Sequence, residues 1–103
     1  NSFSNSDVSG AQVFYKKNVP SSEEFALVMQ QTFNSINKKE KKPKVGDYYL
    51  LNNSGDLNGV MVECGFLSNT EERNQLITDA YQEKIASLIK DGILAYLDAK
   101  NRI

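Results

Sequence analysis

A nearly continuous apolar run, Gly-Val-Met-Val-Glu-Cys at residues 59–64, constrains the fold of this chain more than any other feature. Glycines stand on both sides of the run, and one carboxylate, Glu63, interrupts it near its end. A short run of this kind, rich in β-branched residues, predicts a strand that is buried on both faces.

The segments before this run predict a strand, a helix and a second strand. Residues 11–15 and 47–51 have the aromatic and branched content of strands. Residues 20–37 predict a helix, in which Ser21 and Glu24 have the spacing of a capping box. Its apolar residues recur at helical spacing and predict the buried stripe: Phe25, Val28, Met29, Thr32, Phe33 and Ile36.

The segments after the run predict two helices. Ser68 or Asn69 is expected to cap a short helix, and a longer helix is expected to start near Asp79. The apolar face of the longer helix comprises Tyr81, Ile85, Leu88, Ile89, Ile93, Tyr96 and Leu97. The full order predicts a single α/β domain over residues 1–103, a mixed sheet flanked by helices.

Composition excludes several classes of protein. With 103 residues, 40% hydrophobic and 24% charged, the chain has room for one small globular domain. Its net charge of −1 provides no overall field for nucleic acid or an acidic membrane, and no apolar run is long enough to cross a membrane. Residues 38–44 are lysine-rich; we interpret them as a solvated loop, with contact to an anionic polymer as the alternative.

The chain contains no histidine and one cysteine. A hydrolytic zinc site usually needs imidazole, thiolate or carboxylate ligands at fixed spacing. Since only carboxylates remain and they do not cluster in the sequence, we expect no ordinary zinc site within this chain. A single cysteine also excludes an internal disulfide. Adjacent strand residues point to opposite faces, so Cys64 is expected to be a buried structural thiol beside Glu63.

Glu63 is the main candidate functional residue. It ends the most apolar predicted strand, and α/β sheets bind ligands at the carboxyl ends of their strands. A carboxylate held there is suited to proton transfer. The alternative is that Glu63 simply reaches solvent or caps the helix expected near Asn69.

Three segments of the chain carry a family resemblance. GVMVECGFLSNTEERNQL resembles the hallmark segment of the zinc-dependent N-acetylmuramoyl-L-alanine amidases, which cleave peptidoglycan. The matching positions are Glu63, Gly65, Phe66, Leu67, Ser68 and Asn69. SGAQVFY is similar to the family's strand after the second metal histidine, and YQEKIASLIKDGILAYL to its closing helix. The resemblance covers almost the whole chain and is greatest to the branch that prepares the spore cortex for germination. Asn58-Gly59 departs from the family's usual Pro-Ala.

The resemblance implies a zinc enzyme of which this chain is the C-terminal portion. Two histidines and a glutamate, all upstream, would hold the zinc, and Asn1 would belong to the His-x-Asn segment of the last ligand. Zinc would polarise the amide carbonyl and activate a water. Glu63 would be the catalytic acid and base, while Asn1 and Lys44 would contact substrate, Lys44 through a stem-peptide carboxylate. The substrate implies a location outside the cytoplasmic membrane.

A second hypothesis is a catalytically inactive module that binds cell wall or a protein partner. The missing zinc ligands favour the module, whereas Glu63 within its full motif favours the enzyme. If upstream strands are absent, the sheet has an unpaired edge, and we expect the isolated chain to self-associate or fold poorly.

Overall fold

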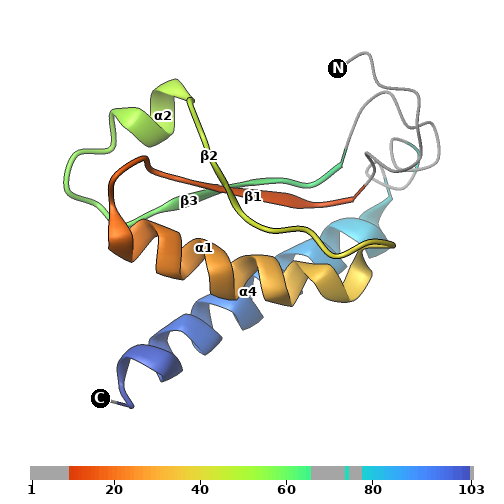
Figure 1. Cartoon of the computed structure of the whole chain (residues 1–103). Coiled ribbons are helices and arrows are strands. Elements are labelled where there is room, and N and C mark those ends of the chain that lie inside the picture. Colours follow the sequence, from red (N-terminus) through yellow and green to blue (C-terminus); the bar gives the residue numbers. More distant parts are fainter. Residues whose placement is uncertain (1–9, 66–73, 75–77, 103) are drawn as a thin grey trace.

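The computed structural model describes residues 10–65, 74 and 78–102 (Figure 1). Its elements are β1 (Gln12–Tyr15), α1 (Pro20–Phe33), the 3-10 helix η2 (Asn34–Ile36), β2 (Lys44–Val45), α2 (Tyr49–Asn52), β3 (Val60–Glu63) and α4 (Asp79–Lys100). The helix predicted after Ser68 or Asn69 lies outside the described residues.

The three strands form a mixed sheet in the order β2-β1-β3, which confirms the predicted α/β class. β1 runs parallel to β2, with Phe14 opposite Lys44. β1 runs antiparallel to β3, with Gln12 opposite Glu63 and Phe14 opposite Met61. Because of these directions and registers, the start of β1 and the end of β3 lie at one end of the sheet, whereas β2 begins beside Phe14, two residues further along β1.

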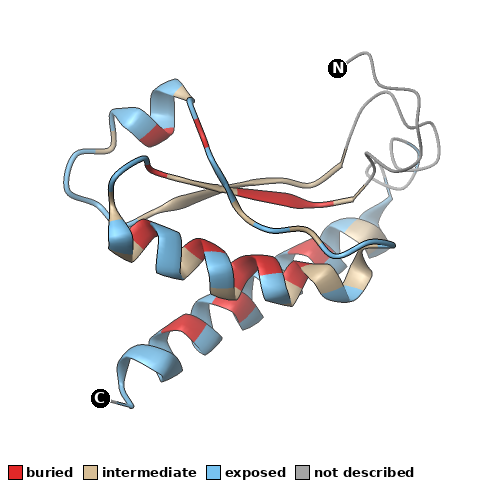
Figure 2. Ribbon diagram, in the orientation of Figure 1, coloured by how far each residue is buried: buried red, intermediate tan, exposed pale blue. Residues whose placement is uncertain are grey.

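The core lies between the sheet and two helices, α1 and α4, which lie together on one side of it (Figure 1). Side chains of alternate strand residues point to the same face, and Val13 on β1 and Ala11 just before it are fully buried. The buried apolar cluster comprises Ala11, Val13, Ala26, Met29, Phe33 and Ile85. Figure 2 shows the buried residues along the inward sides of both helices.

The predicted capping box at the start of α1 is wrong. The N-cap is Val19, no side chain caps the helix, and a proline follows at the first helical position, where its missing N–H is no loss. Ser22 is fully buried instead. Its Oγ accepts a hydrogen bond from Lys16 N (2.9 Å) and donates one to Gly59 O (2.7 Å). Ser22 therefore joins the helix to the residue that follows β1 and to the residue that precedes β3.

The strand predicted at residues 47–51 is also wrong, because α2 occupies this segment. Tyr48 O and Tyr49 O accept helical hydrogen bonds from Asn52 N and Asn53 N, both at 2.9 Å. Among the described residues no strand pairs with this segment, so a helical turn satisfies the backbone locally. Its apolar side chains divide unevenly: Leu51 is buried, whereas Tyr49 is 78% and Leu50 76% exposed.

β3 is not buried on both faces as predicted, since all four of its residues are half-buried. It stands at the edge of the described sheet, and α1 and α4 cover one face only (Figure 1).

The long final helix starts at Asp79 as predicted, and Thr78 Oγ1 caps it by accepting from Tyr81 N at 3.2 Å. Its inward residues are Ile85, Gly92 and Tyr96. The Tyr96 ring stacks on Phe25 of α1, with 4.7 Å between ring centroids. The predicted apolar face extends beyond this contact, because Ile93 is 40% and Leu97 50% exposed.

Candidate functional site

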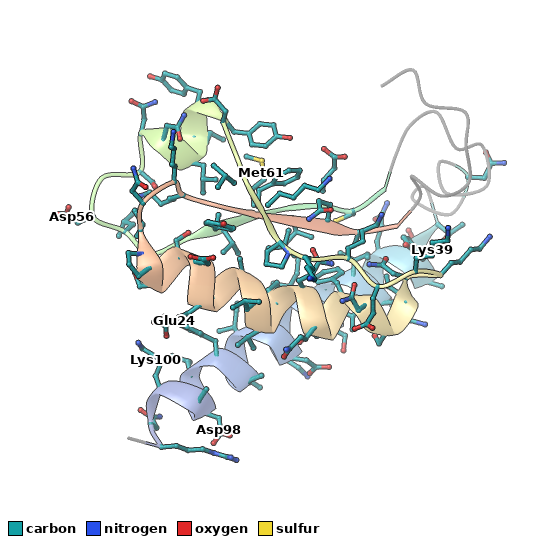
Figure 3. The ribbon with its side chains drawn as sticks, in the orientation of Figure 1. Glu24, Lys39, Asp56, Met61, Asp98 and Lys100 are labelled. Carbon is teal, nitrogen blue, oxygen red and sulfur yellow. The ribbon has the colours of Figure 1, made fainter. Side chains whose placement is uncertain are left out.

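Glu63 lies at the carboxyl end of β3, on the sheet face that points away from α1 and α4. Residues directly opposite each other on paired strands share a face, so Glu63 shares this face with Gln12, its partner on β1. Phe14 and Met61 form the next pair on the same face. Figure 3 shows Met61 on the far side of the sheet from α1. Glu63 is half-buried, and its backbone is held by the pairing of β3 with β1.

Lys44 shares that face, because its partner in β2–β1 pairing is Phe14. The structure therefore brings Lys44 and Glu63 to the same face of the sheet, but Lys44 is level with Phe14 and Met61, two residues along from Glu63. Lys44 and Glu63 are on the two outer strands with β1 between them, so they are separated by two strand spacings, about 10 Å across the sheet, and by two residues, about 7 Å along the strands. Lys44 is exposed. Asn1, the other predicted substrate contact, lies outside the described residues.

Two side-chain amides, of the buried Gln30 and the half-buried Asn37, bond the backbone along the edge of β1 beside this site. Gln30 Oε1 accepts from Val13 N (2.8 Å), and Gln30 Nε2 donates to Ala11 O (3.0 Å). Asn37 bonds the N–H and the C=O of Ala11 at 2.8 and 3.0 Å. These amides act as a strand would, because they satisfy the backbone groups that β2 is too short to reach.

Two further amides, of Gln12 and Asn34, hold the lysine-rich segment against the sheet. Gln12 Nε2 donates to Lys42 O at 2.8 Å and contacts Gln30 Oε1 at 3.3 Å. Asn34 bonds the N–H and the C=O of Lys41 at 3.1 and 3.0 Å. The sequence analysis missed this network. The available signal was Gln30 itself, a polar residue between Met29 and Phe33 on the inward side of α1.

Cys64 follows Glu63 and packs against the core on the opposite face, half-buried rather than buried as predicted. Burial, and secondarily the Glu63 carboxylate, raise the pKa of the Cys64 thiol. A raised pKa lowers the thiolate fraction and so the reactivity. This agrees with a structural thiol.

Lys16 is a second group that the sequence analysis missed. It is 7% exposed, and its ammonium donates to Ser54 Oγ (2.8 Å), Gly55 O (2.8 Å) and Leu57 O (3.2 Å). Three neutral acceptors replace the water that burial removes. Lys16 thereby fixes the loop that leads into β3.

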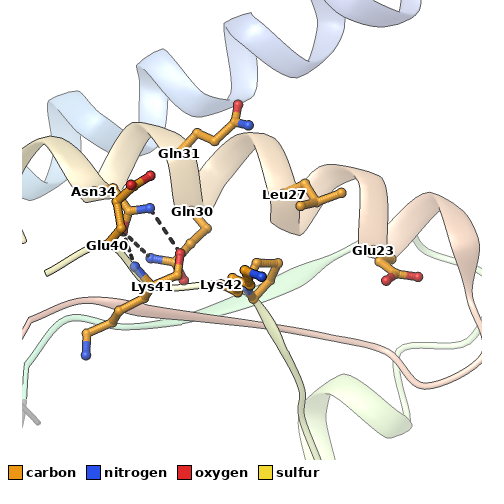
Figure 4. A pocket seen from close by; sticks show the side chains of 9 residues that line it. Glu23, Leu27, Gln30, Gln31, Asn34, Glu40, Lys41 and Lys42 are labelled. Carbon is orange, nitrogen blue, oxygen red and sulfur yellow. Dashed lines mark hydrogen bonds between the residues drawn. The ribbon is translucent and has the colours of Figure 1, made fainter.

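A groove of about 450 Å³ lies between α1 and residues 40–43 (Figure 4). Its lining comprises Glu23, Leu27, Gln30, Gln31, Asn34, Glu40, Lys41, Lys42 and Pro43. Glu63 is not among the residues that line this groove. One of its walls is the lysine-rich segment that Gln12 and Asn34 hold.

No metal-ligand cluster of three or more His, Cys, Asp or Glu side chains occurs in residues 10–65, 74 and 78–102. The chain also has no histidine, so the described residues do not fit a zinc ion. In the same residues, no helix combines the length and the apolar character that a membrane crossing requires.

The fold and the site define an α/β layered domain with a carboxylate at a strand end, beside a basic segment. Residues 1–95 match the model of the N-acetylmuramoyl-L-alanine amidase family, and the chain belongs to this family.

Individual relatives agree with this assignment. The germination-specific N-acetylmuramoyl-L-alanine amidase of Bacillus subtilis (strain 168) is 37% identical over 94 residues, which are 89% of this chain and 39% of that protein. The CwlD amidase of Clostridioides difficile, solved in complex with the GerS lipoprotein, superposes with a TM-score of 0.84 at 36% identity, covering 96% of this chain and 51% of that one.

The catalytic domain of CwlV, an amidase from Bacillus (Paenibacillus) polymyxa var. colistinus, superposes with a TM-score of 0.76 at 28% identity and covers 95% of this chain and 54% of that one. These relatives confirm the predicted resemblance to the amidases and to their spore-cortex branch. The chain spans about half the length of the solved structures and 39% of the Bacillus subtilis protein.

Proposed function

We propose that the complete protein hydrolyses the amide bond between N-acetylmuramic acid and L-alanine in peptidoglycan, outside the cytoplasmic membrane. Residues 1–103 would be the C-terminal portion of its catalytic domain. The family match over residues 1–95 supports the reaction class. The observation that carries the proposal within this chain is Glu63, held at the end of β3 on the sheet face opposite the helices.

In this proposal Glu63 is the general acid and base. Its carboxylate takes a proton from the attacking water as the water oxygen bonds to the amide carbon. It then gives that proton to the leaving nitrogen as the carbon–nitrogen bond breaks. A catalytic group must be held rigidly, and pairing of Glu63 with Gln12 on β1 supports such a role.

The zinc ion that the family resemblance implies has no ligand set among the described residues. We propose that its ligands lie in sequence upstream of this chain. Asn1 and Lys44 remain the proposed substrate contacts, and Lys44 has the exposure and the sheet face that contact with an anionic stem peptide requires.

The test compares peptidoglycan digestion by the complete gene product and by its Glu63→Gln variant, with free L-alanine amino termini as the readout. We expect the variant to lose activity about a hundredfold or more, as for loss of a general acid and base. Glu83→Gln, on the exposed side of α4, is the matched control and should keep full activity. A chelator should abolish the wild-type reaction.

One outcome would replace this proposal. If the folded gene product binds peptidoglycan but releases no amino termini, the protein is an inactive wall-binding module with an amidase fold.

A further inference from the structure

Residues 38–44, Lys-Lys-Glu-Lys-Lys-Pro-Lys, are called the lysine ridge below. The ridge carries five lysines and one glutamate, a net charge of +4 in a chain of net charge −1, so the other residues carry −5. The sequence alone favours a solvated loop here. Three structural observations favour a built binding surface instead.

First, the backbone of the ridge is anchored. Asn34 bonds both backbone groups of Lys41, at 3.1 and 3.0 Å. Gln12 bonds Lys42 O at 2.8 Å, and the ridge ends in β2. Gln12 is itself 4% exposed and bonded to Gln30. A segment that only needed hydration would not require these side-chain amides, of which Gln12 is buried and Asn34 half-buried, and which restrict its conformational freedom.

Second, the anchored backbone presents charge to solvent. Lys38, Lys42 and Lys44 are exposed, and within the described ranges none of the three forms an ion pair. Holding like charges close together is unfavourable without an opposing charge. Conversely, a surface already ordered in this way loses less entropy when an anionic partner binds.

Third, the ridge lies near the end of the sheet that holds Glu63. Figure 1 shows it passing from the end of α1 across to β2. Its anchor, Gln12, is the residue opposite Glu63, and Lys44 shares the sheet face of Glu63. A polymer bound along the ridge would therefore pass close to the proposed catalytic carboxylate.

We propose that the lysine ridge binds the repeated anionic groups, carboxylate or phosphate, of a cell-wall polymer and holds that polymer beside Glu63. The identity of the polymer rests on the proposed function. The position of the ridge favours a wall polymer over nucleic acid, because the end of the sheet that holds Glu63 is where the wall substrate must lie.

The test measures binding of the complete gene product to insoluble peptidoglycan, in a Glu63→Gln background that prevents digestion. The ridge variant combines Lys38→Gln, Lys42→Gln and Lys44→Gln. Its matched control combines Lys17→Gln, Lys84→Gln and Lys90→Gln, which removes the same charge from exposed sites elsewhere. We expect the ridge variant to bind about tenfold more weakly at low salt and the control to bind normally, with the difference shrinking at high salt.

Two further variants separate charge from anchoring. Lys→Arg at the same three ridge positions should retain binding. Asn34→Leu keeps every charge but releases Lys41, so it should weaken binding. If the triple Gln variant does not fold, single substitutions at Lys38 and Lys44 apply the same test. Wall stripped of phosphate polymers distinguishes the two anions: retained binding identifies carboxylates, and lost binding identifies phosphates.

Equal loss in the ridge and control variants would overturn the proposal, and so would tighter binding to duplex DNA than to either wall preparation. The activity assay keeps the two proposals distinguishable. If binding depends on the ridge but wild-type protein releases no amino termini, the ridge proposal stands and the amidase proposal falls. If termini are released and ridge variants bind normally, the reverse holds.

Discussion

Glu63 and Cys64 are neighbours in sequence that the alternation of β3 sends to opposite faces. Burial and then the Glu63 carboxylate raise the pKa of the Cys64 thiol. We therefore expect Cys64 to be alkylated more slowly near neutral pH than an exposed thiol. Glu63→Gln removes the neighbouring negative charge, so it should increase the rate of Cys64 alkylation. Iodoacetamide kinetics between about pH 7 and about pH 10 would measure both effects.

The matched control is Ser87→Cys in a Cys64→Ser background, because Ser87 is exposed on α4. The same raised pKa has a consequence for stability. The fold favours the neutral thiol, so this contribution is complete below the pKa of the unfolded thiol and is lost as pH rises through the folded one. Equal alkylation rates at both positions would contradict the assignment of Cys64 to the core.

At the residue scale, a motif located Glu63 at a strand end, and strand alternation separated it from Cys64. The partners of buried polar groups were not predictable in this way. Gln12, Gln30 and Asn37 are far apart in sequence, and only the approach of α1 and η2 to β1 makes them neighbours. Hydrophobic periodicity carries no information about such contacts.

At the element scale, Gln30 is the side chain through which α1 supports β1. Gln30→Leu would leave Val13 N without its 2.8 Å partner in a buried setting. An unsatisfied buried donor costs about 1–3 kcal/mol, so we expect a loss of that size in the free energy of unfolding, measured with urea. Gln31→Leu, on the exposed side of the same turn, should change it by no more than about 0.5 kcal/mol.

Gly92 sets how closely α4 approaches α1. A Cβ at this position would overlap Sδ of Met29, and the Met29 Cε would be 2.9 Å away. We expect Gly92→Ala to cost about 1–3 kcal/mol from overpacking, offset by up to about 1 kcal/mol of helix propensity. Thermal unfolding would measure the net loss.

The steric explanation for Gly92 has its own control. Met29→Ala makes room at the same contact, so the double variant should lose less than the sum of the two single losses. Strictly additive losses would show that the two residues do not compete for space.

The elements with long or strongly patterned sequences were predictable: β1, α1, β3 and α4 occur where expected. The failures lie where the pattern is short. Residues 47–51 have strand-like composition, but a strand needs a partner, and the described chain forms α2 there. The prediction that β3 is buried on both faces failed for a related reason. A run of apolar residues does not show whether its strand lies at the edge of a sheet.

At the scale of the whole molecule, the described chain leaves apolar surface uncovered. Tyr49, Leu50 and Leu57 are each more than 70% exposed, and the described helices α1 and α4 cover one sheet face. The solved amidases to which the chain is similar are about twice as long, since it covers 51% and 54% of two of them. We infer that this surface packs against the remainder of a larger domain in the complete protein.

The isolated 103-residue chain is therefore expected to self-associate. Gln30, Asn37 and β2 close one side of β1, whereas β3 has no strand on its outer edge in the described sheet. Unpaired edges recruit other chains, and charge on an edge strand opposes this. Sedimentation velocity should show a mass that grows with concentration, and Met61→Lys on β3 should reduce it. Leu94→Lys, on the exposed face of α4, should not. If only Leu94→Lys reduces self-association, the chains meet through α4. A monomer with a sharp cooperative melt would contradict the prediction of self-association.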